Sequence, residues 1–481
     1  MQGNVLELLL AKPWLLLIAI FCLGISIFVH ELGHYLAARW RGLHAPRFSI
    51  GFGRKIWSWT DRHGTEFRLA WIPLGGYVAL PQLADMGSLE GGKGEETKPL
   101  PPVGYLDKVI VAVAGATFNI LFAILLGTIL WGVGQEVATG SQSTEIGYVV
   151  PTLTRAEGDK VPSPAAVAGL RVGDVIRSID GKQTRVWNDV LKSLVFGSGR
   201  SEEGKRTAEF VIERAGQRLA VTLYPELATK GKVRRVGIGA TNTLNIQSVT
   251  EGKPAARAGF LAGDKILRID SVPIRSEMTL ADLVTTEPAK PHAVTVLRAG
   301  AEHTFEVPAG LLTDKLQDWG AELLYDSVRI HSNPIEQVWN QIAESLQTLW
   351  IVINPRSDVR ATDMGGPLEI VRQFVFAADD GVFTLIYFVL LINVALAVFN
   401  LMPIPVLDGG HVLFATIARL RGRPLPLNIV ETVQTVFLVL LLSLMLYVLT
   451  NDVRRIARDA QPAAVEEDAP KPPAEPAPVK P

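Results

Sequence analysis

Four long apolar stretches punctuate the chain, separated by polar segments of very different length. They are Trp14–Val29, Val109–Val133, Phe383–Met402 and Val433–Leu449. A membrane-spanning helix needs roughly 20 predominantly apolar residues, so each stretch is a candidate span. The first lacks the basic start and the Ala-x-Ala-like end of a cleaved signal peptide, so we expect it to be retained. The pattern predicts a multi-pass α-helical membrane protein with four transmembrane helices.

The long polar segment between the second and third spans contains an internal repeat. The stretches "AAVAGLRVGDVIRSIDG" (Ala165–Gly181) and "AARAGFLAGDKILRIDS" (Ala255–Ser271) align at a constant offset of 90 residues. Each is followed by strand-like alternation of apolar and polar residues, in "AEFVIER" and "HAVTVLR". One module used twice explains this pattern, and we expect two small α+β modules in tandem.

Three further segments have patterns of their own. Arg47–Leu80 is typical of two strands joined by a turn at Asp61–Gly64. Pro334–Trp350 places its apolar residues on one helical face, which suits a helix lying on the membrane or packing against the protein. The Pro- and Ala-rich tail, Gln461–Pro481, is predicted to be disordered.

Composition supports a membrane protein and its charge pattern predicts an orientation. The 481 residues include 47 basic and 48 acidic ones, so no overall charge favours nucleic acid, and the single cysteine excludes an intramolecular disulfide. Short loops rich in Lys and Arg stay in the cytoplasm. That rule places the N-terminus, the repeats and the tail on the opposite side of the membrane. Three arginines in the tail argue against this placement of the tail. The basic residues of the two short loops are Arg39, Arg41, Arg47, Arg54 and Lys55, and then Arg419, Arg421 and Arg423.

The first span ends in "HELGH", which predicts a metal site. On a helix, His30 and His34 lie one above the other on one face, and Glu31 lies beside the water that a bound zinc activates. The alternative is a set of polar residues that reach for water at a helix end. That alternative leaves unexplained why an acid and two ligands share one face at membrane depth.

A catalytic zinc needs a third protein ligand, and Asp408 is our candidate. It follows Pro403 and Pro405, which break the third apolar stretch. Unwound backbone at membrane depth is tolerated only where it is buried in protein or lines a wet cavity, so the break itself indicates a site. The alternative is that Asp408 caps the helix that follows it.

These motifs together resemble the site-2 protease family of intramembrane zinc metalloproteases, peptidase family M50. Besides "HELGH", they are "PLGGYV" (Pro73–Val78), "AGATFN" (Ala114–Asn119) and "NLMPIPVLDG" (Asn400–Gly409). Relatives usually carry proline where this chain has Ala116, a difference that concerns helix packing more than chemistry. The resemblance covers roughly residues 10 to 455.

The resemblance implies roles for individual residues. His30, His34 and Asp408 hold Zn²⁺, and Glu31 is the catalytic residue. The hairpin becomes a membrane-dipping β-loop that pairs with an unwound substrate, although a plain cytoplasmic hairpin also fits its pattern. The residues expected to hold the substrate are Asn400, Gly75, Gly76 and Tyr77.

The repeated module resembles the bacterial PDZ domain, an α+β half-open β-barrel. A PDZ groove adds a peptide strand to an open sheet edge, and loop amides hold the peptide's carboxylate. Whether the modules bind tails or act as rigid spacers and size filters is left open by the sequence. The residues expected to bind peptide are Ile146, Gly147 and Tyr148, and Gly237, Ile238 and Gly239.

The family implies a protease in the bacterial inner membrane that cuts single-span membrane proteins. Its substrates would be an anti-sigma factor trimmed by a first protease and remnant signal peptides, in an envelope stress response. The modules would be periplasmic, with the active site toward the cytoplasm. The predicted organisation is the first span (1–42), the β-loop region (43–108), the second span (109–135), the two PDZ modules (140–228 and 233–310), the amphipathic helix (330–355), the third span with the third ligand (381–412), the fourth span (430–451) and the tail (459–481).

Two other classes of function remain possible from the sequence. One is a membrane-anchored PDZ scaffold that captures exported tails and holds a structural metal. A structural zinc is normally closed by four protein ligands and has no use for Glu31. The other is a metal transporter, which the tandem peptide-binding modules disfavour.

Overall fold

The computed structural model divides the chain into two compact units, each described here by itself. The first comprises 1–114, 365–388 and 403–481, and the second 115–364 and 389–402. The structure describes residues 5–83, 103–155, 159–227, 234–286, 290–309, 319–359 and 365–459. The tail predicted to be disordered lies outside these residues.

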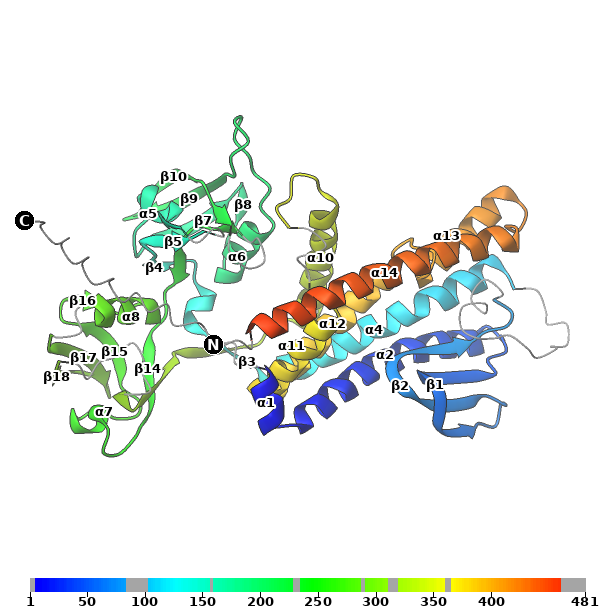
Figure 1. Cartoon of the computed structure of the whole chain (residues 1–481), viewed down its shortest axis with the longest axis horizontal. Helices are drawn as coiled ribbons and strands as arrows, with labels where there is room; N and C mark the ends of the chain where they lie inside the picture. The colour runs from blue at the N-terminus through cyan, green and yellow to red at the C-terminus, as the bar shows by residue number, and fades with distance from the viewer. Residues whose placement is uncertain are drawn as a thin grey trace, which may run out of the picture. The chain divides into compact units, whose positions relative to one another are not determined.

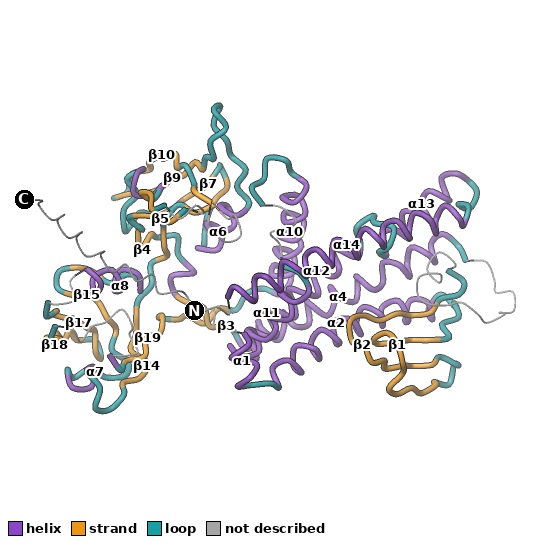
Figure 2. The backbone as a smooth tube through the Cα atoms, viewed as in Figure 1, coloured by secondary structure: helices purple, strands orange, loops and turns teal. Residues whose placement is uncertain are grey.

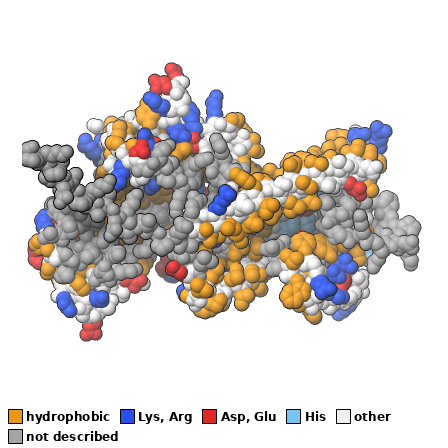
Figure 3. All heavy atoms as spheres, in the orientation of Figure 1, with side chains coloured by type: hydrophobic (Ala, Val, Ile, Leu, Met, Phe, Trp, Pro, Cys, Tyr) orange, Lys and Arg blue, Asp and Glu red, His pale blue; other side chains and the backbone are white. Residues whose placement is uncertain are grey.

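Four helices are long and apolar enough to cross a membrane, as the apolar stretches predict. Their surfaces carry exposed large apolar side chains, for example Phe21 on α2 and Leu440 on α14. Figure 3 shows such side chains covering the visible face of α14. Exposed apolar surface of this kind is stable only in a lipid environment. The four helices are α2 (Trp14–Trp40), α4 (Tyr105–Val133), α12 (Val382–Asn400) and α14 (Leu427–Asp459).

The first unit contains two helices that the sequence pattern did not predict, α1 (Val5–Ala11) and α11 (Pro367–Asp380). α11 packs against α2. Its first turn is capped by a residue of α14, because the buried Asp452 carboxylate accepts hydrogen bonds from the Gly366 and Glu369 amides. A carboxylate at a helix N-terminus satisfies amides that have no partner within the helix.

The predicted hairpin is present and lies beside α2 (Figure 1). β1 (Arg47–Thr60) and β2 (Glu66–Ala79) pair antiparallel around the turn at residues 61–65. Phe48 of β1 and Val78 of β2 are almost fully buried in one core with Tyr35 of α2 and Val111 of α4. This core fixes the hairpin against the end of α2 that carries the two histidines.

The third apolar stretch is broken, as its prolines predict. α12 ends at Asn400, and α13 (Asp408–Arg421) begins eight residues later. Within the first unit, the loop before α13 passes close to Gly410 in the first turn of that helix. A Cβ at Gly410 would lie 2.2 Å from the Ile404 carbonyl oxygen, so only glycine fits there.

In the second unit, a strand pair joins the two ends of the repeat region. β3 (Gln135–Ala138) directly follows α4, and β20 (Ser327–Ile330) precedes α10 (Pro334–Ile353). The two strands pair antiparallel, with Ala138 opposite Ser327. The segment predicted to form an amphipathic helix is helical in α10, and Asn333 is its N-cap.

The two repeats contain the same buried ion pair at equivalent positions. Arg214 donates to both oxygens of the Asp174 carboxylate and to the Gly169 carbonyl. Arg298 does the same with Asp264 and Gly259 in the second repeat. Burial by itself would raise the pKa of Asp264, but the Arg298 hydrogen bonds and the Leu261 amide hold it below its ordinary value.

Each repeat has a core of its own, built from small sheets and short helices (Figure 2). None of these sheets closes into a barrel among the described residues. The first repeat contains β4 (Ile146–Val149), β5 (Thr152–Thr154), β6 (Lys160–Pro162), α5 (Pro164–Val167), β7 (Val175–Ile179), β8 (Lys182–Gln183), α6 (Trp187–Val195), β9 (Ala208–Arg214), β10 (Gln217–Leu223), β11 (Glu226–Leu227), β12 (Arg234–Arg235) and β13 (Ile238–Ala240). The second contains β14 (Leu244–Val249), α7 (Pro254–Arg257), β15 (Lys265–Ile269), β16 (Val272–Pro273), α8 (Glu277–Thr286), β17 (His292–Arg298), β18 (Ala301–Val307) and β19 (Ala321–Tyr325).

The boundary between the repeats lies later than the sequence indicates. β13, which the expected limits place in the second module, pairs with β4 of the first. The second repeat extends past residue 310, because β19 pairs with β14 and Trp319 lies in its core. The reason is that both edge strands pair with partners far away in the sequence, which local periodicity does not reveal.

Candidate metal centre

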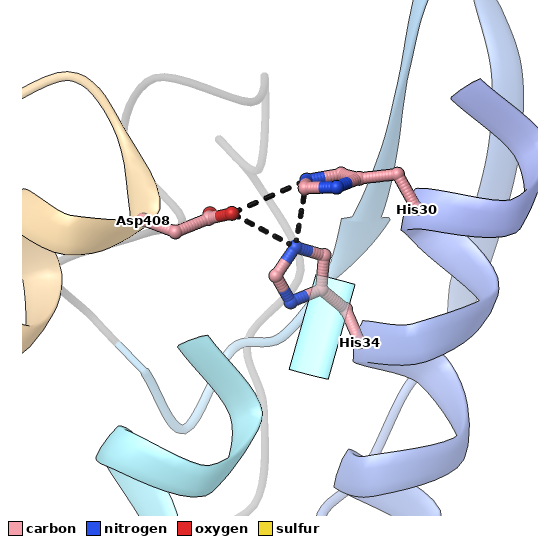
Figure 4. Close-up of side chains that lie close together, drawn as sticks. All are labelled: His30, His34 and Asp408. Atoms are coloured by element: carbon pink, nitrogen blue, oxygen red, sulfur yellow. Dashed lines mark hydrogen bonds and ion pairs between the residues drawn. The ribbon is translucent and has the colours of Figure 1, made fainter. Parts of the chain in front are cut away.

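Two elements of the first unit bring three potential ligands together. His30 Nε2 lies 3.2 Å from His34 Nε2, and Asp408 Oδ2 lies 3.2 Å from the first and 3.3 Å from the second (Figure 4). The three atoms therefore form a nearly equilateral triangle. Asp408 lies about 370 positions after the two histidines in the chain. Among the described residues, this is the one group of His, Cys, Asp and Glu side chains with metal-binding geometry.

The size of this triangle fits zinc. Zinc lies about 2.0–2.1 Å from histidine nitrogen and carboxylate oxygen, so two ligands of a tetrahedral site are about 3.3–3.4 Å apart. Asp408 Oδ2 is buried and has no hydrogen-bond partner of good geometry among the described residues. Three buried ligand atoms that converge on one point are the arrangement expected around a cation.

Local structure presents each ligand. His30 and His34 are one turn apart on α2, and His34 is only 4% exposed. The Nδ1 atom of His34 donates to the Val111 carbonyl at 2.7 Å, which leaves Nε2 with its lone pair toward the other ligands. Asp408 is the first residue of α13, where the cap position belongs to Leu407 and no side chain caps the helix. The capping alternative for Asp408 therefore has no support.

Glu31 lies next to the triad in the chain and is held by β2. The Val78 amide lies near the Glu31 carboxylate. The Gly76 backbone lies against the aliphatic stem of Glu31, with room for no side chain between them. Gly76 and Val78 of one strand thus lie beside the Glu31 side chain.

The three hairpin residues expected to bind substrate face two different ways. Gly76 faces α2, as described above. Gly75 and Tyr77 face the other side, where Tyr77 stacks on Phe52 with ring centroids 6.3 Å apart. A Cβ at Gly75 would meet the same Phe52 ring. Asn400, the last residue of α12, belongs to the second unit, and its role stays a prediction.

The residues expected to bind peptide all lie on one strand pair of the first repeat. Ile146, Gly147 and Tyr148 are buried in β4, where Gly147 packs against Ala240, Thr241 and Arg275. Gly237, Ile238 and Gly239 lie at or in β13. Among the described residues, β4 is the one strand that pairs with β13.

Sequence reasoning missed the supporting contacts around the triad. The Val111 carbonyl, the Val78 amide and the close approach of Gly410 to Ile404 are backbone features. Backbone groups carry no residue-type signal, so motif spacing could not identify them. The "GG" pairs at 75–76 and 409–410 were the only hint, because paired glycines often mark close backbone approach.

Comparison with known proteins identifies the class. The model of Peptidase family M50 matches residues 18–444. The chain belongs to this family, and it is a zinc-dependent membrane metalloprotease.

Several relatives match over nearly their whole length. The regulator of sigma E protease of Salmonella typhi is 28% identical over 478 residues, which cover 93% of this chain and all of the relative. The regulator of sigma-E protease RseP of Escherichia coli K12 is 28% identical over 483 residues, with coverage of 93% and 100%. A putative zinc metalloprotease of Neisseria meningitidis is 29% identical over 480 residues, with coverage of 92% and 99%.

Proposed function

We propose that this protein cuts single-span membrane proteins within or near the membrane. The observation that carries the proposal is the triad of His30, His34 and Asp408, which joins an apolar helix to the start of α13. Its position on α2 is about 24 Å along the helix from Trp14, inside a hydrocarbon core that is roughly 30 Å thick. A hydrolytic site at that depth suits a peptide bond that itself lies in the membrane.

We assign the residue roles from this geometry together with the family resemblance. His30, His34 and Asp408 would hold zinc, which supplies a Lewis acid when bound. Glu31 accepts the proton of the attacking water and returns it to the leaving amine. A helical substrate hides its peptide bonds in its own hydrogen bonds and must unwind first. β2 and Asn400 would hold the unwound strand.

The substrate class is a regulatory single-span protein. Relatives named as regulators of sigma E support an anti-sigma factor, trimmed by a first protease, as the substrate in an envelope stress response. Remnant signal peptides form a second class, because they are also short apolar helices without large domains. Both classes share one feature, the lack of a bulky folded domain.

The two repeats would be PDZ modules that control access to the membrane core. Among the described residues, β13 and β19 are terminal strands of their sheets, which supports strand addition. Size exclusion is the part of this role that we favour, because β3 and β20 hold the repeats beside the ends of α4 and α10. The repeats would face the periplasm and the basic loops the cytoplasm of a bacterial inner membrane.

Purified full-length protein and a model single-span substrate test the proposal. We expect cleavage within or near the span, abolished by a zinc chelator and restored by added Zn²⁺. A soluble protein lacking a span should be cut far more slowly. Cleavage that persists after the zinc has been removed and verified absent would refute the proposed function.

A further inference from the structure

Gly76 occupies the tightest point between β2 and the helix that carries Glu31. A Cβ built on Gly76 would lie 2.9 Å from Glu31 Cγ, 2.9 Å from the Ser49 carbonyl oxygen and 3.0 Å from Ile27 Cγ2. Gly76 is not among the residues with positive φ. Space alone, and not backbone conformation, therefore demands glycine here.

Of the three atoms around Gly76, the one on Glu31 can move most easily, because the Ser49 oxygen is a backbone atom and Ile27 is β-branched with a restricted χ1 angle. Ser49 is 1% exposed and its carbonyl belongs to β1, which is held by the buried Phe48. Ile27 lies one turn before Glu31 on the same helix. The Glu31 side chain has rotatable bonds and would absorb the displacement. Its carboxylate would then move away from the Val78 amide.

We infer that Gly76 is a positioning residue for Glu31, because its missing side chain lets β2 lie directly against the Glu31 stem and so fixes where the carboxylate can point. This inference rests on the proposed function. It differs from the substrate-binding role that the family resemblance implies for Gly76. A substrate contact changes KM, whereas a displaced general base lowers kcat at unchanged KM.

The test compares Gly76→Ala with Gly24→Ala in the purified full-length protein. Gly24 lies on α2 as well, but a Cβ there meets nothing within 4 Å, so it is a matched control. For Gly76→Ala we expect kcat on the single-span substrate to fall roughly 10²-fold, since misplacement by about 1 Å has that effect. KM should change by less than about twofold and bound zinc should stay at the wild-type level. Gly24→Ala should leave kcat, KM and zinc content unchanged.

A second measurement needs no catalysis. In zinc-free protein, Gly76→Ala should lower the midpoint of thermal unfolding, and by clearly less in a Glu31→Ala background, where Cγ is absent. A raised KM with unchanged kcat, loss of zinc, or equal effects in both backgrounds would overturn the inference. A wild-type protein whose cleavage ignores the chelator would instead overturn the proposed function, so the two failures are distinguishable.

Discussion

At the scale of single residues, the proposed general base and the proposed zinc ligands are different side chains, although Glu31 directly follows His30 on α2. His34 has its Nε2 atom within 3.3 Å of Asp408 Oδ2 and its Nδ1 atom on the Val111 carbonyl. The aliphatic stem of Glu31 lies against Gly76 of β2. Substitutions can therefore separate binding of the ion from turnover.

Glu31→Gln should retain zinc and lose turnover by about 10²- to 10⁴-fold, because an amide cannot accept the proton of water. His34→Ala or Asp408→Ala should lose both zinc and activity, since each removes a ligand. Metal analysis of the purified variants, paired with cleavage of the single-span substrate, measures the two properties separately. Wild-type rates in Glu31→Gln would contradict the assigned mechanism and favour a scaffold with a structural metal.

At the scale of elements, the segment after α10 is anchored to the first repeat through one carboxylate. Asp358 is 7% exposed in its side chain and pairs with Arg200 at 2.7 Å, Arg206 at 2.9 Å and Arg234 at 2.9 Å. Burial would raise the pKa of Asp358, but the three guanidinium groups outweigh it and hold the pKa below its ordinary value. This link joins the segment after α10 to the repeat that follows α4.

The stabilisation from Asp358 should depend on pH in one direction. Because its pKa is lower folded than unfolded, the stabilisation is complete above the ordinary carboxyl pKa and is lost as the pH falls below it. Asp358→Asn should abolish this dependence and speed amide hydrogen exchange in residues 354–359. Glu203, an exposed acid of the first repeat, provides the control substitution Glu203→Gln. Equal exchange rates in the two variants would show that the ion pairs of Asp358 with the three arginines do not stabilise residues 354–359.

At the scale of the whole molecule, the register of β3 and β20 permits a clean test of the access role. Ala138 and Ser327 are paired residues, so Thr139–Asp326 can be replaced by an Asn-Gly turn without breaking the strand pair. If the repeats exclude bulky substrates, the shortened protein should cut single-span substrates that still carry a folded domain, and it should keep its zinc. Intact protein that cuts trimmed and untrimmed substrates at equal rates would contradict the access role.

Orientation in the membrane makes a second prediction at this scale. Water should reach the triad from the cytoplasmic side, because His30 lies near the end of α2 that precedes the basic loop. Single cysteines replacing Leu407 or Tyr77, in a Cys22→Ser background, should react faster with a polar thiol reagent supplied from the cytoplasm. Leu420→Cys and Val167→Cys, both highly exposed, mark the two sides. The opposite preference would reverse the proposed topology.

The sequence by itself determined the four spans, the hairpin, the repeat and the residues of the triad. Each of these has a local signature: an apolar run, an alternation, a constant offset, or a spacing of four residues on a helix. Asp408 was identifiable because two prolines break the span before it, which is costly without a site.

Only the tertiary structure decided how these parts meet. The pairing of β13 with β4, the capping of α11 by Asp452 and the approach of Gly76 to Glu31 join residues far apart in the chain. Such contacts depend on backbone groups and on the space left by missing side chains, which have no periodicity to detect. The triangle of ligand atoms is the same kind of result: its members were predicted singly, and packing set the distances between them.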